Sequence, residues 1–525
     1  MTGEAYLASR HKWIVGFTCL LGIFMEILDT SVANVALATI QGSFAAGTDE
    51  VTWVITTYLV ANAIILPITG WLGNYFGRKR LYLACLALFT LTSFLCGAAQ
   101  SLSFLILMRI LQGLAGGAMV PLSQAITFEA FPKEEQGYAS ALYGIGAICG
   151  PVLGPLLGGW ITDNWSWPWI FFINVPVGII ALFLAAAFVK DPPYLRRPEG
   201  RVDGWSFLFI AVGLGFLELF LSRGERNDWL ASTMIQVFLL LALVGLALFI
   251  WRSFTARNPL VNLRLFRRPE FAGGMLLIFL SSVGMYGGFL CLPIFVQRLL
   301  GYTPTWAGVI LAPSGLASMV AMVLAGILVG KVHVRVLVGL GLAGMAWGAW
   351  MLAGLNLDVG VAHLALAVAV FGFGMGLLLV PLASESMRRV PNAWMGTASG
   401  LFNLLRNEGG SVGIAVCTTI LAQRAQFHHA RLAEQVTPFN GLLQHQAAAL
   451  AQGLFPRAGQ APTAVAQLGA GLLGAEVTRQ AYLMSFVDVF AFLAAVLALA
   501  IPFVLLMRQF PAESAALGEA AGRQA

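Results

Sequence analysis

Charged residues are scarce in this sequence. Asp, Glu, Lys and Arg make up only 10% of its 525 residues, whereas 59% of the residues are hydrophobic. In soluble domains about a quarter of the residues are charged, so the composition excludes an ordinary soluble protein. It indicates a polytopic membrane protein.

Cysteine is also scarce, and no residues are grouped as in a catalytic or metal site. The six cysteines are spread over apolar runs without a Cys-x-x-Cys pair, which argues against a disulfide framework or a cysteine metal site. The strings Gly-x-Ser-x-Gly at 409–413 and Gly-x-Gly-x-x-Gly at 339–344 lie in or beside apolar runs, where helix packing accounts for them. We therefore expect neither an enzyme nor a metal or cofactor site.

Apolar runs of about 20 residues, long enough to cross a bilayer as helices, recur fourteen times. The expected spans are 13–36, 51–73, 81–99, 102–127, 137–161, 169–189, 205–222, 232–251, 271–296, 304–330, 335–354, 360–384, 396–422 and 483–507. The fold class is therefore an all-α polytopic membrane protein with both chain ends on one side. Six spans precede residue 190 and six follow residue 270, which indicates a 6+2+6 arrangement: a bundle at 1–190, a two-helix insert with linkers at 191–270, and a bundle at 271–525.

The basic residues orient these spans. Of the 30 Lys and Arg, 21 lie in the loops and tails on the side of the N-terminus, 7 lie in the opposite loops and two lie within spans. Cytoplasmic loops carry this excess, so we expect both termini in the cytoplasm. Because the basic residues are not gathered in one patch, the net charge of +6 does not indicate a nucleic-acid partner. The first span has no cleavage site and is expected to be retained.

The first span contains two acids, Glu26 and Asp29, which share one face of a helix. An ionised acid near the bilayer centre costs roughly 2.5–3.5 kcal/mol, and such acids usually take part in ion or substrate movement. The alternative is that they solvate the far helix end. Counting from Trp13 at about 1.5 Å per residue puts both beyond the midplane, toward the outside.

Other polar residues also fall within the spans. Arg109 has no partner nearby in sequence, so a partner across the bundle is expected, with a fixed structural ion pair as the alternative to a functional one. Arg406 and Glu408 are expected either to line a substrate cavity or to neutralise one another, and Glu218 lies near a span end. The full set of cavity candidates is Asn34, Asn62, Gln112, Gln124, Glu218, Tyr286, Asn403, Arg406 and Glu408.

The fifth span combines a glycine repeat with two prolines. Its glycines recur every fourth residue, which leaves a groove where another helix can approach closely, and Pro151 and Pro155 bend the helix. The glycines are Gly146, Gly150, Gly154 and Gly158. This pattern favours a pliable gating helix over static packing.

A long extracytoplasmic loop is expected at 423–482. Its Ala, Leu and Gln content favours short amphipathic helices. His428 and His429 lie in it without acids or cysteines at ligand spacing, so we favour a polar helix face over a metal site.

Several stretches resemble the major facilitator superfamily. The glycine-proline run looks like its antiporter motif, residues 70–80 are similar to its signature between spans 2 and 3, and residues 109–113 resemble its arginine motif. Residues 28–37 and 169–178 are similar to the fourteen-span drug:proton antiporter branch of the EmrB/QacA type. Residues 403–413 and the loop residues His428, His429, Leu432 and Phe439 resemble the EmrB subgroup. Asn74 departs from the pattern, because the signature usually has an acid there.

The resemblance implies a major facilitator fold with fourteen transmembrane helices in a bacterial inner membrane. It implies proton coupling by Asp29, Glu26 and Arg109, with Arg109 tuning the acidity of a carboxylate in the first span. It also implies that Gly70, Gly77 and Arg78 close the cytoplasmic side, and that the proton gradient is the energy source. By the same resemblance, the long loop contacts a periplasmic membrane-fusion adaptor through His428, His429, Leu432 and Phe439, and an outer-membrane channel completes a tripartite pump.

We therefore expect a proton-coupled multidrug efflux antiporter for hydrophobic or amphipathic compounds. One alternative is an exporter or flippase of an endogenous lipid, metabolite or siderophore, which would share every motif. The other is a non-transporting membrane sensor, which would not need the first-span acid, Arg109 and the glycine-proline helix together.

Overall fold

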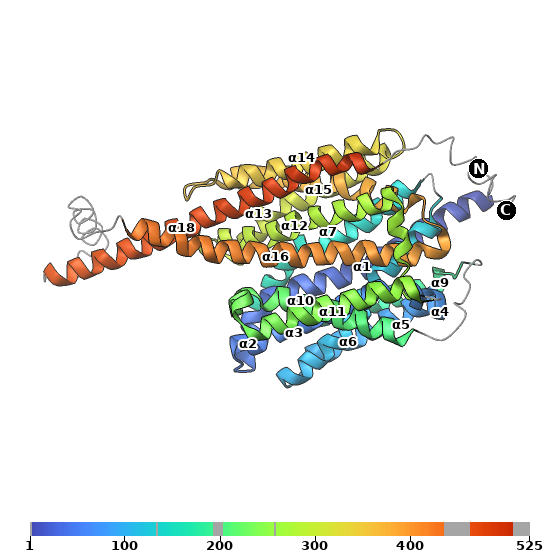
Figure 1. Ribbon diagram of the computed structural model, residues 1–525, viewed down its shortest axis with the longest axis horizontal. Helices are drawn as coiled ribbons and strands as arrows, with labels where there is room; N and C mark the ends of the chain where they lie inside the picture. The colour runs from blue at the N-terminus through green and yellow to red at the C-terminus, as the bar shows by residue number, and fades with distance from the viewer. Residues whose placement is uncertain (1–2, 133–134, 193–202, 257–258, 435–461, 508–525) are drawn as a thin grey trace.

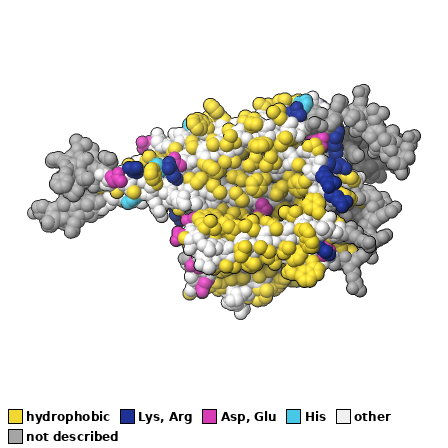
Figure 2. Space-filling model, viewed as in Figure 1, with side chains coloured by type: hydrophobic (Ala, Val, Ile, Leu, Met, Phe, Trp, Pro, Cys, Tyr) yellow, Lys and Arg dark blue, Asp and Glu magenta, His cyan; other side chains and the backbone are white. Residues whose placement is uncertain are grey.

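The computed structural model is a long bundle of helices, most of them aligned with its longest axis (Figure 1). It describes the chain except residues 1–2, 133–134, 193–202, 257–258, 435–461 and 508–525. The all-α prediction is confirmed. Figure 2 shows hydrophobic side chains over the face of the bundle in view, while Lys and Arg gather at the end where α1 begins.

The helices follow the apolar runs. The first part of the chain forms α1 (Gly3–Ser43), α2 (Thr48–Val51), α3 (Trp53–Ile65), η1 (Leu66–Ile68), α4 (Thr69–Phe76), α5 (Arg78–Gly97), α6 (Leu102–Ala130), α7 (Gln136–Asn164), α8 (Trp169–Phe172) and α9 (Asn174–Phe188). The middle forms α10 (Gly204–Arg223) and α11 (Thr233–Thr255). The last part forms α12 (Pro269–Arg298), α13 (Pro304–Leu328), α14 (Val334–Ala353), α15 (Val361–Arg388), α16 (Met395–Ala433) and α18 (Pro462–Ala500).

Among the described residues, twelve helices are long and apolar enough to cross a membrane, and bent α7 makes thirteen if it is one span. Helix α16 is long enough but not apolar enough to be counted with them, because it carries Asn403, Arg406 and Glu408 in the stretch expected to span the membrane. It nevertheless packs between α12 and α18. Each of the fourteen expected spans thus coincides with a helix or a broken helix. Twelve or thirteen of the described helices are candidate spans by length and composition.

Helix α7 packs closely against α1 along the glycine groove. A Cβ added to Gly150 would lie 2.5 Å from Cγ2 of Ile27, and one added to Gly158 would lie 3.0 Å from Cγ1 of Val32. Gly146 faces Ile23 and Gly154 faces Ser31 in the same way. The helix bends by 41° between the segments Gln136–Pro151 and Leu156–Asn164, where its two prolines lie.

Helix α1 is longer than the expected first span, which carries the two acids. The expected span ended at residue 36, but the helix continues to Ser43. Within the apolar part of α1, His11–Ser43, Glu26 lies 15 residues after the start and 17 before the end. The two acids are therefore near the middle of the helix, and their position relative to the bilayer midplane stays a prediction.

The expected loop at 423–482 is also corrected in part. Helix α16 continues to Ala433 and α18 begins at Pro462, because the Ala-rich and Leu-rich sequence on both sides extends the neighbouring spans. Figure 1 shows the two helices extending together beyond the rest of the bundle.

Candidate functional site

A buried ion pair joins α1 to α6. Nη1 of Arg109 lies 2.5 Å from Oδ2 of Asp29, and both side chains are 0% exposed. Arg109 thus has the cross-bundle partner that its isolation in sequence requires. Because neither charge reaches water, each depends on the other and on the surrounding hydrogen bonds.

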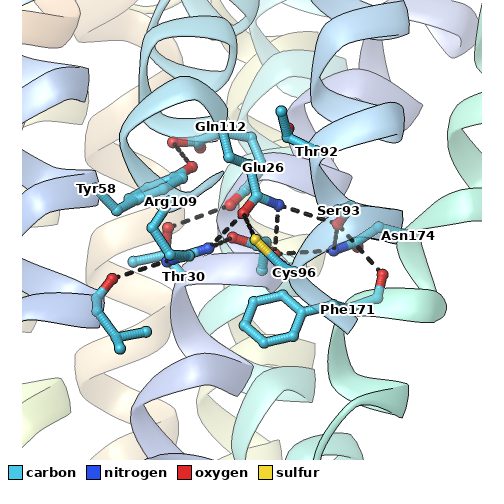
Figure 3. A network of polar contacts seen from close by, with 12 residues as sticks. Glu26, Thr30, Tyr58, Thr92, Ser93, Cys96, Arg109, Gln112, Phe171 and Asn174 are labelled. Atoms are coloured by element: carbon cyan, nitrogen blue, oxygen red, sulfur yellow. Dashed lines mark hydrogen bonds and ion pairs between the residues drawn. The ribbon is translucent and has the colours of Figure 1, made fainter. Parts of the chain in front are cut away.

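Side chains from α5, α6 and α9 form the hydrogen bonds around the pair (Figure 3). Oδ1 of Asp29 accepts from the side-chain amides of Gln112 on α6, at 3.0 Å, and Asn174 on α9, at 2.9 Å. Both amides also donate to Oγ of Ser93 on α5, at 3.0 and 3.1 Å. The carboxylate is therefore satisfied on both oxygens, as a buried charge requires. We call Asp29, Ser93, Arg109, Gln112 and Asn174 the Asp29 cluster.

Asn174 and Ser93 were missing from the predicted site. Asn174 interrupts the apolar run 169–178, and a buried amide in such a run was the signal available. Ser93 gives no such signal, because serine is common in transmembrane helices and only the packing of α5 against α6 and α9 brings it to Gln112.

Aromatic rings cover the guanidinium of Arg109. Its Cζ lies 4.1 Å from the ring centre of Tyr58 and 5.6 Å from that of Phe171. Its Nε donates to the backbone carbonyl of Val54 at 3.1 Å. These contacts tie Arg109 to α3 as well as to α1, so a change at Asp29 acts on two neighbouring helices.

Glu26 has separate partners, one helical turn away. Oε1 of Glu26 accepts from Nδ2 of Asn62 at 2.8 Å and from the hydroxyl of Tyr58 at 3.2 Å. Asn407 on α16 donates to Oδ1 of Asn62 at 3.2 Å, which connects this group to the later half of the chain. Glu26 also interacts electrostatically with Arg406.

A second polar network joins α6 and α7 to α16. Oε1 of Gln124 accepts from Ser399 at 2.6 Å and from Nδ2 of Asn403 at 2.8 Å. The hydroxyl of Tyr143 donates to Oδ1 of Asn403 at 2.5 Å and accepts from Nη1 of Arg406 at 2.5 Å. The structure thus brings Gln124, Asn403 and Arg406 together, and it adds Tyr143, which was not among the predicted residues.

Arg406 and Glu408 do not neutralise one another. Residues two apart on a helix point to nearly opposite sides: Arg406 faces Tyr143, whereas Glu408 interacts electrostatically with Glu218 of α10. Glu218 is buried and accepts a hydrogen bond of 3.0 Å from Ser411.

Of the two remaining cavity candidates, Asn34 lies apart from these networks, whereas Tyr286 interacts electrostatically with Arg406 and Tyr143. Asn34 is exposed and donates to the carbonyl of Thr30, one turn back on the same helix. Tyr286 is partly buried and lies against Gly410, where an added Cβ would be 2.8 Å from its ring.

Helix α4 and the first residue of α5 contact the chain at and just before the start of α16. A Cβ on Gly70 would lie 2.5 Å from the carbonyl carbon of Gly396, so the two backbones touch. Nη2 of Arg78 donates to the carbonyl of Asn392 at 3.1 Å, and Nη1 pairs with Glu129 at the end of α6. The signature position that usually holds an acid is Asn74, and Glu129 supplies an acid to Arg78 from another helix.

Gly77 adopts a backbone conformation that favours glycine. Its φ is +91°, and a Cβ there would lie 2.9 Å from Oδ2 of Asp191. Asp191 also accepts a hydrogen bond of 2.8 Å from the backbone N–H of Lys79, which satisfies the first turn of α5. Sequence reasoning included Gly77 and missed Asp191.

Of the four expected adaptor contacts, three are described. His428 is buried and its Nε2 lies 2.7 Å from Oδ2 of Asp488 on α18, so it joins two helices of this chain. His429 is exposed and Leu432 is partly buried. Phe439 lies outside the described residues.

Comparison with known proteins gives consistent matches over most of the chain. A family model described as Major Facilitator Superfamily matches residues 19–414. The fatty acid resistance protein FarB of Neisseria gonorrhoeae is 36% identical over 82% of this chain and 85% of its own. The multidrug export protein EmrB of Escherichia coli K12 is 33% identical over 93% of this chain and 94% of its own. The solved human organic anion transporter MFSD10 shares the fold, with a TM-score of 0.58 at 15% identity over 93% of this chain and 99% of its own.

Proposed function

Because this chain belongs to the major facilitator superfamily, a family of transporters and not of enzymes, we propose that it is a proton-coupled antiporter that exports hydrophobic or amphipathic compounds. The observation that carries the proposal is the Asp29 cluster, a fully buried ion pair at the middle of an apolar helix. Such a pair stabilises a soluble protein poorly and is costly in a membrane, so a role in moving protons explains its presence better than stability does.

Asp29 is the proposed proton carrier. When ionised, its carboxylate pairs with Arg109 and accepts from Gln112 and Asn174. A proton arriving from outside cancels the negative charge, so Arg109 loses its counter-ion while it remains bonded to α3. The contact between α1 and α6 is then weakened, while the contact between α6 and α3 is kept. This difference favours movement of α1 relative to the other two helices. Release of the proton to the cytoplasm restores the ion pair.

The proposed movement is a rocking of two six-helix bundles, 1–190 and 271–525, with the insert 191–270 between them and fourteen spans in all. Three features support it. The glycine groove lets α1 and α7 approach closely, α7 is bent at its prolines, and the Gly70 and Arg78 contacts with α16 close one end of the interface. The membrane potential contributes about 2.3 kcal/mol per charge per 100 mV to inward proton movement.

The names of the relatives guide the expected substrates. One relative is a fatty acid resistance protein and another a multidrug export protein, so amphipathic compounds are the proposed substrates. The proposed location is the inner membrane of a bacterium with both termini in the cytoplasm. The extension of α16 and α18 is the proposed contact for a periplasmic adaptor, and an outer-membrane channel would complete the pump. The fatty acid name also favours the second candidate, an exporter of an endogenous lipid.

Transport by the purified protein in proteoliposomes tests the proposal. We expect an outwardly directed proton gradient, with the vesicle lumen acidic, to drive accumulation of amphipathic compounds. Asp29→Asn should abolish that accumulation while substrate exchange without a gradient persists. Glu50→Gln is a matched control, because Glu50 is an exposed acid beyond the end of α1. Full gradient-driven transport by Asp29→Asn would show the assignment to be wrong.

A further inference from the structure

Arg406 is a buried cation without an ion-pair partner. Arg406 is only 4% exposed. None of the ion pairs in the described part of the chain includes it. Its Nη1 donates to the hydroxyl of Tyr143, and its Nε has no hydrogen-bond partner. The carboxylate of Glu26 interacts electrostatically with Arg406, but it is already hydrogen-bonded to Tyr58 and Asn62. A buried guanidinium in this condition is costly unless an anion joins it.

The network around Arg406 has a surplus of donors. The acceptors Oε1 of Gln124, Oδ1 of Asn403 and the hydroxyl oxygen of Tyr143 all receive hydrogen bonds within it. Nε2 of Gln124, which is fully buried, has no acceptor, and neither has Nε of Arg406. The complementary ligand is therefore an acceptor with negative charge, such as a carboxylate.

The surroundings of this network are apolar. The ring of Tyr143 belongs to a buried cluster with Ile23 and Val120, and Ile27 and Ala147 pack against it. These residues come from α1, α6 and α7, so apolar side chains of the earlier helices lie beside a cation of α16. An apolar tail joined to an acidic head matches both parts.

We propose that Arg406, with Gln124, binds the acidic head of an amphipathic anion, so that the substrates of this transporter include lipophilic carboxylates. This deepens the proposed export function and rests on it. Glu26 is the nearby negative charge and opposes such a ligand, which gives the two residues opposite effects on affinity. The Asp29 cluster is a separate group of residues that shares no member with this network.

Binding of two probes with the same tail tests the charge preference directly. Dodecanoate and dodecyltrimethylammonium are titrated calorimetrically into the full-length protein in lipid nanodiscs, with empty nanodiscs subtracted, at a pH where dodecanoate is ionised. We expect tighter binding of dodecanoate. Arg406→Gln should weaken it about tenfold or more, because a hydrogen-bonded charge is lost, without weakening the cation, while Glu26→Gln should strengthen it.

Control variants separate recognition from folding. Arg406→Lys keeps the charge and should retain more dodecanoate binding than Arg406→Gln. Arg431→Gln removes an exposed arginine from the same helix and should change neither probe. If Arg406→Gln does not fold, Gln124→Leu decides the question, because it removes the other unpaired donor. Unchanged dodecanoate binding, or an equal loss of both probes in a folded variant, would overturn the proposal.

The same measurements distinguish this inference from the export proposal. Asp29→Asn should retain dodecanoate binding even though it loses gradient-driven transport. Arg406-dependent binding of dodecanoate without proton-coupled transport would contradict only the export function. Proton-coupled transport of cations that Arg406→Gln leaves intact, together with absent dodecanoate binding, would contradict only the anion site.

Discussion

Glu26 and Asp29 lie three residues apart on α1, yet they have separate hydrogen-bond partners: Asn62 and Tyr58 for Glu26, and Gln112 and Asn174 for Asp29. Tyr58 lies between the two groups, since its hydroxyl donates to Glu26 and its ring covers Arg109. The two acids are therefore not equivalent. Asp29 has a direct counter-ion, whereas Glu26 faces the interface with α16.

The first prediction concerns Asn174. Asn174→Leu removes one of the amide donors to the Asp29 carboxylate and so disfavours its ionised form by about 1–3 kcal/mol. We expect the pH at which transport is half-maximal to move upward, because the proton is then released less readily. The measurement is the pH profile of proteoliposome uptake. Asn164→Leu is the control, since Asn164 is exposed at the end of α7. An identical pH profile for Asn174→Leu and wild type would contradict the expectation.

The second prediction concerns Gly70. Gly70→Ala forces the backbones of α4 and α16 apart, because its Cβ would overlap Gly396 and Thr397. We expect the contact at this end to open, so that a cysteine introduced at Thr397 reacts faster with a membrane-impermeant thiol reagent in inside-out vesicles. Gly339→Ala is the matched control, because a Cβ there meets no atom within 4 Å. Equal labelling in both variants would show that the contact does not close this end.

The third prediction concerns the start of the insert. Oδ2 of Asp203 accepts from Nε of Arg252 at 2.9 Å, and its carboxylate caps Ser206 at the first turn of α10. Burial alone would raise the pKa of Asp203, but the hydrogen bonds from Arg252 and Ser206 outweigh it and hold that pKa below its usual range. Because the pKa of Asp203 is lower in the folded protein than in the unfolded chain, its ionised carboxylate stabilises the fold at pH values above the unfolded pKa, near 3.9. This stabilisation is lost as the pH falls through the pKa of Asp203 in the folded protein.

Asp203→Ala should therefore loosen the first turn of α10 by about 0.5–2 kcal/mol at neutral pH. Hydrogen exchange of the amides at 206–208 should be faster than in wild type near pH 7, with the difference shrinking in strong acid. Asp358→Ala, in the segment between α14 and α15, serves as the control. Unchanged protection of these amides would mean that the cap contributes nothing.

The fourth prediction concerns the extension of α16 and α18. Asp488 holds Arg424 at 2.5 Å and His428 at 2.7 Å. Asp488→Ala should separate the two helices there, and we expect weaker co-purification of a periplasmic adaptor together with faster hydrogen exchange at 424–430. Deleting 430–475 should abolish co-purification while the carrier stays folded. Retained co-purification after the deletion would contradict the adaptor proposal.

Much of the fold could be predicted from the sequence, because membrane-spanning helices require long apolar runs and short polar loops. The boundaries at the ends of α1, α16 and α18 could not, since moderately apolar, Ala-rich sequence continues a helix beyond the bilayer length without any break signal. Helix α16 is the opposite case. Its polar residues make it the least apolar of the long helices, and its partners on α6 and α7 supply the hydrogen bonds that hydropathy does not represent.

The candidate site was predictable where a residue stands out from its own helix. Asp29 and Arg109 do so, and the structure brings them together. Ser93, Tyr143, Glu129 and Asp191 were missed because each has a partner on a distant helix, and no sequence spacing connects them. That Glu408 interacts with the like charge of Glu218 in the insert, and not with Arg406, likewise depends on which side of α16 each residue faces.

The ion pair of Arg78 with Glu129 joins α5 to α6, whereas the hydrogen bond of Arg78 to Asn392 reaches the segment just before α16. Parting the bundles at this end breaks a bond to a neutral carbonyl while the two charges travel together. Opening this end therefore does not require the separation of Arg78 from Glu129. Its free-energy barrier should depend less on ionic strength than it would if the acid paired with Arg78 lay on the other bundle. An acid transferred to the α16 side, in place of Glu129, would make the same motion sensitive to salt.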